Sequence, residues 1–248
     1  MAGTLSGKVA LVTGAGRNIG RAIALHLARD GAAVVVNGRS DQAAIDAVVG
    51  EITAAGGQAL ACLADVSDPA AVARMTEQAA ATFGGIDIAI SNAGLRRQTA
   101  FLDMSPAEWR EIMSVALDGA FNLAQSVLPQ MIRRGGGAIV GLSGVSTHVG
   151  SPNRAHVSAS KSGLEGLMRA LAVEFAPHNI RCNCVAPGAI DTVRGTAAGP
   201  NPGTLPAVPL GRRGSVDEIA ATVRLLVGPE GGYNTGQTIH VNGGVFLT

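Results

Sequence analysis

Three glycines near the N-terminus form a short turn whose spacing suits the binding of a phosphorylated ligand. Gly14, Gly16 and Gly20 carry no side chain, so the backbone there can turn sharply and approach a ligand closely. An apolar run that ends at Thr13 precedes the turn, and a helical pattern begins near Ile19. A helix that begins at such a turn directs unpaired N–H groups toward an anion. This arrangement predicts a cradle for the pyrophosphate of a dinucleotide, although such a turn can also simply join a strand to a helix.

Two arginines near the predicted adenosine ribose indicate which dinucleotide binds. A second strand over residues 33–36 ends at Asn37, where an NAD site usually places an acidic residue for the ribose 2′-hydroxyl. Asn37 carries no charge, whereas Arg39 follows it and Arg17 lies in the glycine-rich turn. Two guanidinium groups favour a 2′-phosphate through charge-assisted hydrogen bonds, so we expect NADP(H) in preference to NAD. The alternative is that both arginines are solvated surface charges.

The composition of the chain sets limits on its class. It has 248 residues, of which 47% are apolar, and a net charge of +1, so neither a nucleic-acid surface nor a membrane surface is indicated. No apolar run is long enough to cross a bilayer, and the first eight residues are too short for a signal peptide. Cys62, Cys182 and Cys184 lack metal-binding or redox spacing, so we expect buried thiols, no metal site and a cytoplasmic location.

Apolar strands alternate with helical patterns along the whole chain, which is typical of a parallel sheet covered on both faces. After the first two strands, apolar segments occur at residues 60–63, 86–90, 138–142, 180–185 and 238–241. We therefore expect one domain over residues 1–248 with an α/β fold, a Rossmann-type, doubly wound, three-layer sandwich around a central parallel sheet of about seven strands. Residues 192–210 carry four prolines and little periodicity, so they are predicted to form a substrate lid.

Several motifs in the right order make the chain resemble the short-chain dehydrogenase/reductase family, and most of all its β-ketoacyl-carrier-protein reductase branch. The motifs are Thr13 to Gly20 (TGAGRNIG), Asp65-Val66, Asn92-Ala93-Gly94, Lys161, Asn183, Pro187-Gly188 and the tail from Thr235 to Gly244. The resemblance covers nearly every residue. It implies homotetramers formed through two long central helices and the C-terminal strand.

The resemblance also implies roles for the cofactor-binding residues. The pyrophosphate would be held by Gly14, Gly16, Arg17, Asn18, Ile19 and Gly20; the adenine by Asp65 and Val66; the rest of the cofactor by Asn92, Ala93, Gly94, Pro187, Gly188, Ile190 and Thr192, the last four at the carboxamide. Lys161 would bind the nicotinamide ribose. Asn18 replaces the family's middle glycine, and because asparagine tolerates left-handed backbone, we expect the turn to survive.

Three of the four groups that the family uses to reduce carbonyls are missing. The family tetrad is Asn-Ser-Tyr-Lys, with the tyrosine four residues before the lysine. Here Val157 stands at the tyrosine position, Gly144 at the serine position and Ala116 at the asparagine position, and only Lys161 remains. A positioned general acid contributes roughly 10²–10⁴-fold in rate, so we do not expect ordinary ketone reduction.

Three interpretations of the altered site stay open. In the first, the chain reduces a conjugated C=C bond, as its likeness to the 2,4-dienoyl-CoA reductase branch around residues 156–161 suggests. Asp118, His148 and His156 are then candidate catalytic groups beside Lys161, although each histidine can equally be a surface or loop residue. In the second, the chain is a lyase, isomerase or dehydratase. In the third, it is an NADP(H)-binding regulator or the inactive partner of a hetero-oligomer.

Two consecutive arginines follow the Asn92-Ala93-Gly94 motif and bear on the substrate. If Arg96 and Arg97 face the pocket, they favour a small anionic substrate such as a carboxylate or a phosphopantetheine thioester. The alternative is an exposed basic loop.

Overall fold

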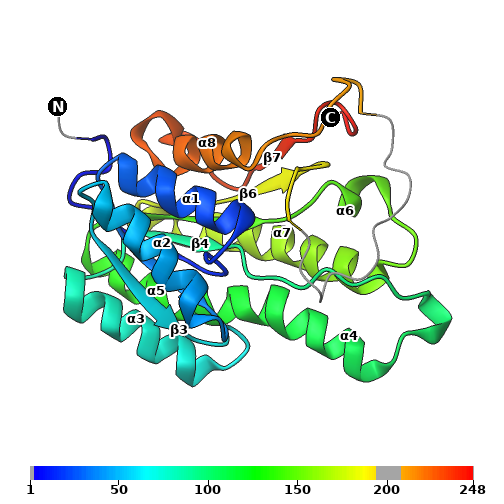
Figure 1. The fold of residues 1–248 in the computed structure, drawn as a ribbon, viewed down its shortest axis with the longest axis horizontal. Helices are drawn as coiled ribbons and strands as arrows, with labels where there is room; N and C mark the ends of the chain where they lie inside the picture. The colour runs from blue at the N-terminus through cyan, green and yellow to red at the C-terminus, as the bar shows by residue number, and fades with distance from the viewer. Residues whose placement is uncertain (1–2, 194–207, 248) are drawn as a thin grey trace.

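A computed structural model describes residues 3–193 and 208–247 of the chain. In these residues seven strands form one parallel sheet in the order β3-β2-β1-β4-β5-β6-β7 (Figure 1). The strands are β1 (Val9–Val12), β2 (Ala33–Gly38), β3 (Ala59–Leu63), β4 (Ile88–Ser91), β5 (Gly137–Leu142), β6 (Ile180–Pro187) and β7 (Thr238–Val241). The predicted fold class, a doubly wound sandwich around a seven-stranded parallel sheet, is confirmed.

Helices cover both faces of the sheet (Figure 1). One face carries α1 (Asn18–Arg29), α2 (Gln42–Ala54) and α8 (Val216–Val227). The other carries α3 (Pro69–Phe83), α5 (Gly119–Arg133) and α7 (Ala155–Phe175). Shorter elements are η1 (Phe101–Asp103), α4 (Pro106–Met113), η2 (Ser114–Asp118), α6 (Ser146–Val149), η3 (Ala176–His178) and η5 (Pro229–Gly231).

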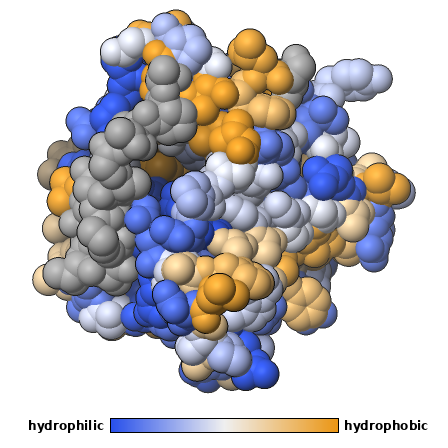
Figure 2. Space-filling model, turned by 90° about the vertical axis from the view of Figure 1, so that its right-hand side faces the viewer, coloured by the Kyte–Doolittle hydropathy of each residue, from blue (hydrophilic) through white to orange (hydrophobic). Residues whose placement is uncertain are grey.

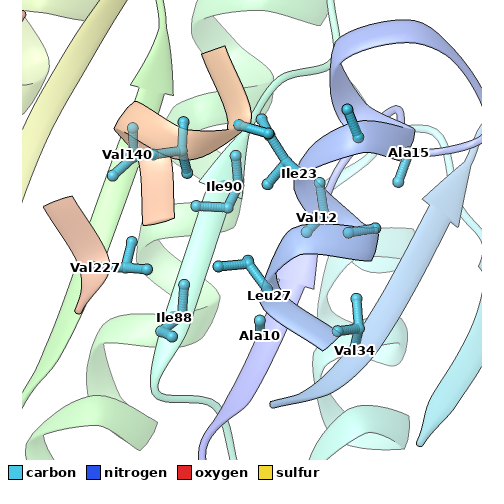
Figure 3. Close-up of a cluster of buried hydrophobic side chains, with 14 of the residues drawn as sticks. Ala10, Val12, Ala15, Ile23, Leu27, Val34, Ile88, Ile90, Val140 and Val227 are labelled. Carbon is cyan, nitrogen blue, oxygen red and sulfur yellow. The ribbon is translucent and has the colours of Figure 1, made fainter. Parts of the chain in front are cut away.

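The strands are buried on both faces, as expected for a parallel sheet between two helical layers. Ala10 and Val12 of β1 point toward Ile23 and Leu27 of α1 (Figure 3), whereas the intervening Leu11 packs in the core on the opposite face. All of these side chains are fully buried. Burial of a large aliphatic side chain contributes about 1.5–3 kcal/mol, so both layers stabilise the sheet that positions the site.

The helical region between Pro106 and Arg133 changes character midway. It runs as α4, then as the π-helical η2, and then as α5. At its start a capping box is only half formed: Ser105 Oγ accepts from Glu108 N–H, but the Glu108 carboxylate accepts from Thr99 instead. At α8 both halves of such a box, formed by Ser215 and Glu218, are present.

The order of the sheet places a ligand site at one edge. The chain leaves β1 toward β2 and β3, and later toward β4 and the strands beyond it; open sheets of this order bind ligands where the order reverses, here at the carboxyl ends of β1 and β4. Figure 2 faces the end of the molecule toward which the strands point, where hydrophobic residues gather in separate patches among hydrophilic ones. Among the helices that the structure describes, none combines the length and the apolar character needed to cross a membrane.

Candidate active site

The glycine-rich turn after β1 is packed too closely for larger residues. Gly14 has a φ of +60°, and a methyl group added to it would lie 3.1 Å from Ala93 Cα. A methyl group added to Gly20 would lie 2.3 Å from Gly14 O, so α1 could not begin where it does. The first turn of α1 thus presents its N–H groups beside bare backbone, and these residues fit a pyrophosphate.

Three polar side chains hold this turn in place. Thr13 Oγ1 accepts from Asn92 N–H at 3.0 Å and from Ala93 N–H at 3.1 Å, and Asn92 Nδ2 donates to Thr13 O and Gly14 O. Asn37 is buried, its Oδ1 accepts from Gly14 N–H, and its Nδ2 donates to carbonyls of β2 and β3. Asn37 therefore ties strand ends together, and does not stand in for the acidic residue of an NAD site.

The residues predicted to bind the adenosine combine positive charge with one carboxylate. Arg17 and Arg39 are both exposed at the ends of β1 and β2. Burial alone would raise the pKa of Asp65, but hydrogen bonds from Ser67 and the charge of Arg39 outweigh it and hold that pKa below its usual value. Val66 is buried beside Asp65. Two solvent-facing guanidinium groups at this end fit a cofactor with a 2′-phosphate better than one without it.

Lys161 lies between the ends of β4 and β5. Its Nζ donates to Leu142 O at 2.5 Å, and a methyl group added to Gly94 would lie 3.4 Å from that Nζ. Removal of water by the surrounding protein, followed by the charge of Arg96, lowers the pKa of Lys161 to about 8. Its ammonium group is therefore a source of positive field at the end of the site where the resemblance predicts the nicotinamide ribose.

The three altered tetrad positions all carry residues without a polar side chain. Val157 lies one helical turn before Lys161 on α7 and is buried, as is Ala116 in η2. Gly144 has room for a larger residue, since an added methyl group would meet nothing nearer than Ser146 Oγ at 3.9 Å. No hydroxyl group stands at any of these three positions.

A buried carboxylate that the sequence reasoning missed lies one turn beyond Lys161. Glu165 is 5% exposed and accepts hydrogen bonds from Ser143 Oγ and, at 3.4 Å, from Thr147 Oγ1. His148 Nε2 lies 3.0 Å from Glu165 Oε1. The available signal was the spacing of Val157, Lys161 and Glu165 on α7, which puts an acid on a stripe that faces the sheet. His148 is thus the candidate histidine whose acidic partner lies one helical turn from Lys161 on α7.

The rings of two other aromatic side chains enclose His148. His240 of β7 meets it edge-on with ring centroids 4.5 Å apart, and Phe246 lies 5.0 Å away. Burial, followed by the charge of His148, lowers the pKa of His240. Half-buried His148 therefore stands in a partly apolar surrounding at the end of α6.

The other two catalytic candidates lie elsewhere. His156 is fully buried with its Nε2 3.2 Å from Glu108 Oε1, so its ring faces α4 and not the Lys161 side of α7. Hydrogen bonds from Thr99 and His156 hold the pKa of Glu108 below its usual value. Asp118 is exposed at the end of η2. The structure does not bring either residue together with Lys161.

The two arginines after Gly94 take different directions. Arg97 pairs with Glu111 of α4 through both terminal nitrogens, at 2.5 and 3.0 Å. Arg96 is exposed, lies 3.5 Å from Thr192 Oγ1 through Nη1, and is close enough to Lys161 to lower its pKa. Arg96 therefore stands at the site, and Arg97 braces α4.

The carboxamide-binding stretch predicted at residues 187–192 is held at several points. Gly188 N–H donates to Val241 O, and Asp191 N–H donates to Gly214 O. Ile190 is buried and forms a bridge with Gly214. The predicted lid over residues 192–210 lies for the most part outside the described residues. Within the described residues, no cluster of three or more His, Cys, Asp or Glu side chains is placed to hold a metal ion.

Comparisons with known proteins agree on the family of the chain. The family described as enoyl-(acyl carrier protein) reductase matches residues 14–246. The 3-oxoacyl-[acyl-carrier-protein] reductase FabG of Staphylococcus aureus is 41% identical over 242 residues, which cover 97% of this chain and 98% of that protein.

Solved structures agree on the fold. A short chain dehydrogenase from Burkholderia cenocepacia in complex with NADP superposes with a TM-score of 0.88 at 33% identity, covering 98% of this chain and 99% of the other. A 7α-hydroxysteroid dehydrogenase complexed with NADH and 7-oxo glycochenodeoxycholic acid gives 0.89 at 33% identity, covering 97% and 94%. The chain therefore belongs to the short-chain dehydrogenase/reductase family, with 3-oxoacyl-[acyl-carrier-protein] reductases among its relatives.

Proposed function

We propose that the chain is an NADP(H)-dependent oxidoreductase that works without the tyrosine and serine of its family. One observation carries the proposal: the close-packed glycine turn after β1 and Lys161 suit a dinucleotide, while buried, apolar Val157 stands where the phenol would be. The Burkholderia cenocepacia relative was solved with NADP. The exposed Arg17 and Arg39 support the phosphorylated cofactor here.

The cofactor is tested by fluorescence titration with NADPH and NADH. We expect tighter binding of NADPH, and a loss of at least about tenfold in NADPH affinity when Arg17 and Arg39 are both replaced by alanine. The affinity for NADH should change little in that variant, because NADH has no 2′-phosphate. Equal affinity of the wild-type chain for the two cofactors would refute the assignment.

The acceptor that suits this site is a conjugated C=C bond next to a carbonyl, as in an enoyl or dienoyl thioester. NADPH, when bound, supplies a hydride. Addition of a hydride to the far carbon of the C=C bond places the negative charge on the carbonyl oxygen as an enolate. Lys161 and Arg96 are the cations at this end of the site, and both stabilise such a charge. Arg96 also supports a small anionic substrate.

His148 is our proposal for the group that protonates the enolate carbon. The Glu165 carboxylate at 3.0 Å fixes the ring, in the way that a third group orients an acid–base histidine in many enzymes. His148→Gln keeps a hydrogen-bond donor for Glu165 but cannot donate the proton. We expect kcat to fall by about 10²–10⁴-fold with little change in KM. An unchanged kcat would exclude His148.

A screen of NADPH oxidation tests the reaction class. We expect turnover with enoyl or dienoyl thioesters and little with simple ketones. Rapid reduction of simple ketones by the wild-type chain would refute the role assigned to Val157. If NADPH binds but no acceptor is reduced, the assignment as an oxidoreductase fails in favour of a binding protein or a lyase.

We also propose a homotetramer built through the central helices. Apolar side chains on α5 and α7 support it, because Phe121 is 47% exposed and Val173 is 81% exposed in the single chain. Light scattering during size-exclusion chromatography measures the mass directly. A monomer at micromolar concentration would refute this assembly.

A further inference from the structure

The residue that departs from the family pattern in the glycine-rich turn makes an unexpected long-range contact. Asn18 begins α1 with a φ of +51°, a backbone conformation that glycine adopts at least cost. Its Nδ2 donates to Val193 O at 2.9 Å, and its Oδ1 accepts from Val193 N–H at 2.9 Å. One amide side chain thus satisfies both backbone groups of a residue 175 positions away.

The contact joins the turn expected to hold the pyrophosphate to the end of the stretch expected to hold the carboxamide. Asn18 belongs to the turn that follows β1, and Val193 belongs to the segment that follows β6. In the sheet, β4 and β5 lie between these strands, and Lys161 and Gly94 lie at the ends of β4 and β5. The Asn18–Val193 contact therefore connects the segments that follow β1 and β6, whose neighbouring elements α1 and β6 are labelled in Figure 1.

The segment from Ile190 to Val193 is held at both of its ends. Ile190 forms a bridge with Gly214, and Arg213 Nη2 donates to Ile190 O at 2.9 Å. At the other end, the Asn18 amide holds Val193. Thr192, which is predicted to bind the cofactor, lies between these anchors, so its position depends on both.

We propose that Asn18 is a positioning residue that clasps the 190–193 segment to the dinucleotide turn and slows the release of the cofactor. The proposal rests on the function proposed above, because it assumes NADP(H) in the cradle. Glycine, the residue of the family pattern, would relieve the backbone at position 18 but could not form the clasp. The clasp is exposed, since Val193 is 81% exposed, so its two hydrogen bonds can open without disturbing the core.

Removing either side of the clasp should have the same effect. We expect Asn18→Gly to raise the rate constant of NADPH dissociation about tenfold, measured by stopped-flow displacement of bound NADPH. Val193→Pro removes the N–H that donates to Asn18 and should act in the same direction. Because the two changes break the same contact, the double variant should be no faster than the faster single one.

A matched control distinguishes the effect of the Val193 backbone contact from any effect of the Val193 side chain. Val193→Ala keeps the N–H and the C=O and changes only an exposed side chain, so it should release NADPH at the wild-type rate. Hydrogen exchange gives a readout independent of the cofactor: the Val193 amide should be protected in the free wild-type chain and lose that protection in Asn18→Gly.

Three results would overturn the clasp. They are an unchanged dissociation rate in Asn18→Gly, an effect of Val193→Ala equal to that of Val193→Pro, or a Val193 amide that exchanges equally fast in the wild-type chain and in Asn18→Gly. Failure of NADPH to bind the wild-type chain would instead overturn the proposed function and, with it, the role of the clasp in cofactor release. The amide measurement keeps the two failures distinguishable.

Discussion

Restoring the family's hydroxyl groups should convert the site into a ketone reductase. The change is Gly144→Ser together with Val157→Tyr, which supplies a hydroxyl to position the carbonyl oxygen and a phenol to protonate it. Position 157 lies one helical turn before Lys161 on the same side of α7, so the phenol would lie near an ammonium whose pKa is about 8. That charge lowers the pKa of a nearby phenol and favours proton donation.

The expected gain follows from the space and the chemistry at the two positions. A methyl group at position 144 would have its nearest neighbour, Ser146 Oγ, at 3.9 Å, so the Cβ of a serine has room there. Val157 is buried, so a tyrosine there displaces neighbours at a cost of about 1–3 kcal/mol in stability. A positioned general acid contributes about 10²–10⁴-fold, which corresponds to about 3–5 kcal/mol in the barrier. We therefore expect ketone reduction to rise by at least about a hundredfold.

The assay is NADPH oxidation with simple ketones, with thermal melting to confirm that each variant folds. Gly144→Ser with Val157→Phe is the matched control, because it adds the ring without the hydroxyl. A Tyr variant that folds, binds NADPH and is no faster than the Phe variant would refute the reasoning. Wild-type turnover of ketones at the rate of the Tyr variant would refute it as well.

Three further predictions follow from charges and close contacts. NADPH affinity should fall as the pH rises through about 8, where Lys161 loses its proton, and titrations of Lys161→Met should lack this step. Asp87 is buried and bonded to Arg134; burial alone would raise its pKa, but the Arg134 and Val9 hydrogen bonds hold it below the usual value. The ionised Asp87 therefore stabilises the fold above about pH 4, and this stabilisation is lost as the pH falls through the lower folded pKa. In urea unfolding at neutral pH, the free energy of unfolding of Asp87→Asn should be about 2–4 kcal/mol lower than that of the wild-type chain, and this difference should shrink in acid. Gly20→Ala forces a methyl group to 2.3 Å from Gly14 O and should weaken NADPH binding in fluorescence titration, whereas Gly50→Ala, whose methyl meets nothing within 4 Å, should not.

The fold and the cofactor end of the site follow from local sequence signals. Alternating apolar strands and helical patterns are enough to predict a doubly wound sheet, because each strand must be buried on both faces. The turn from Gly14 to Gly20 can be predicted in the same way. A side chain at Gly20 would collide with Gly14 O, and one at Gly14 would lie close to Ala93 Cα. In both cases the information lies within a few neighbouring residues.

The reacting end of the site depends on contacts between distant residues, which a single sequence does not reveal. From the sequence, Glu165 is only one more charged residue of a predicted helix. In the structure, the side chains of Ser143, Thr147 and His148 all contact its carboxylate. From the sequence, Asn37 stands where an NAD site has an acidic residue at the ribose. In the structure, its side-chain amide connects the ends of β1, β2 and β3 by hydrogen bonds. The side-chain direction of Arg96 and Arg97 likewise becomes visible only in three dimensions.

The charged residues that remain at the site and the family tyrosine that is missing together indicate which hydride acceptor to expect. Lys161 and Arg96 leave two cations at the reacting end, while Val157 removes the proton donor that a ketone requires. A ketone that accepts hydride becomes an alkoxide, which is too basic to persist and needs a proton in the same step. An enolate spreads its charge over oxygen and carbon and is less basic, so two nearby cations stabilise it until a second group protonates carbon. This electrostatic difference, and not the shape of the pocket, is the reason to expect a conjugated acceptor.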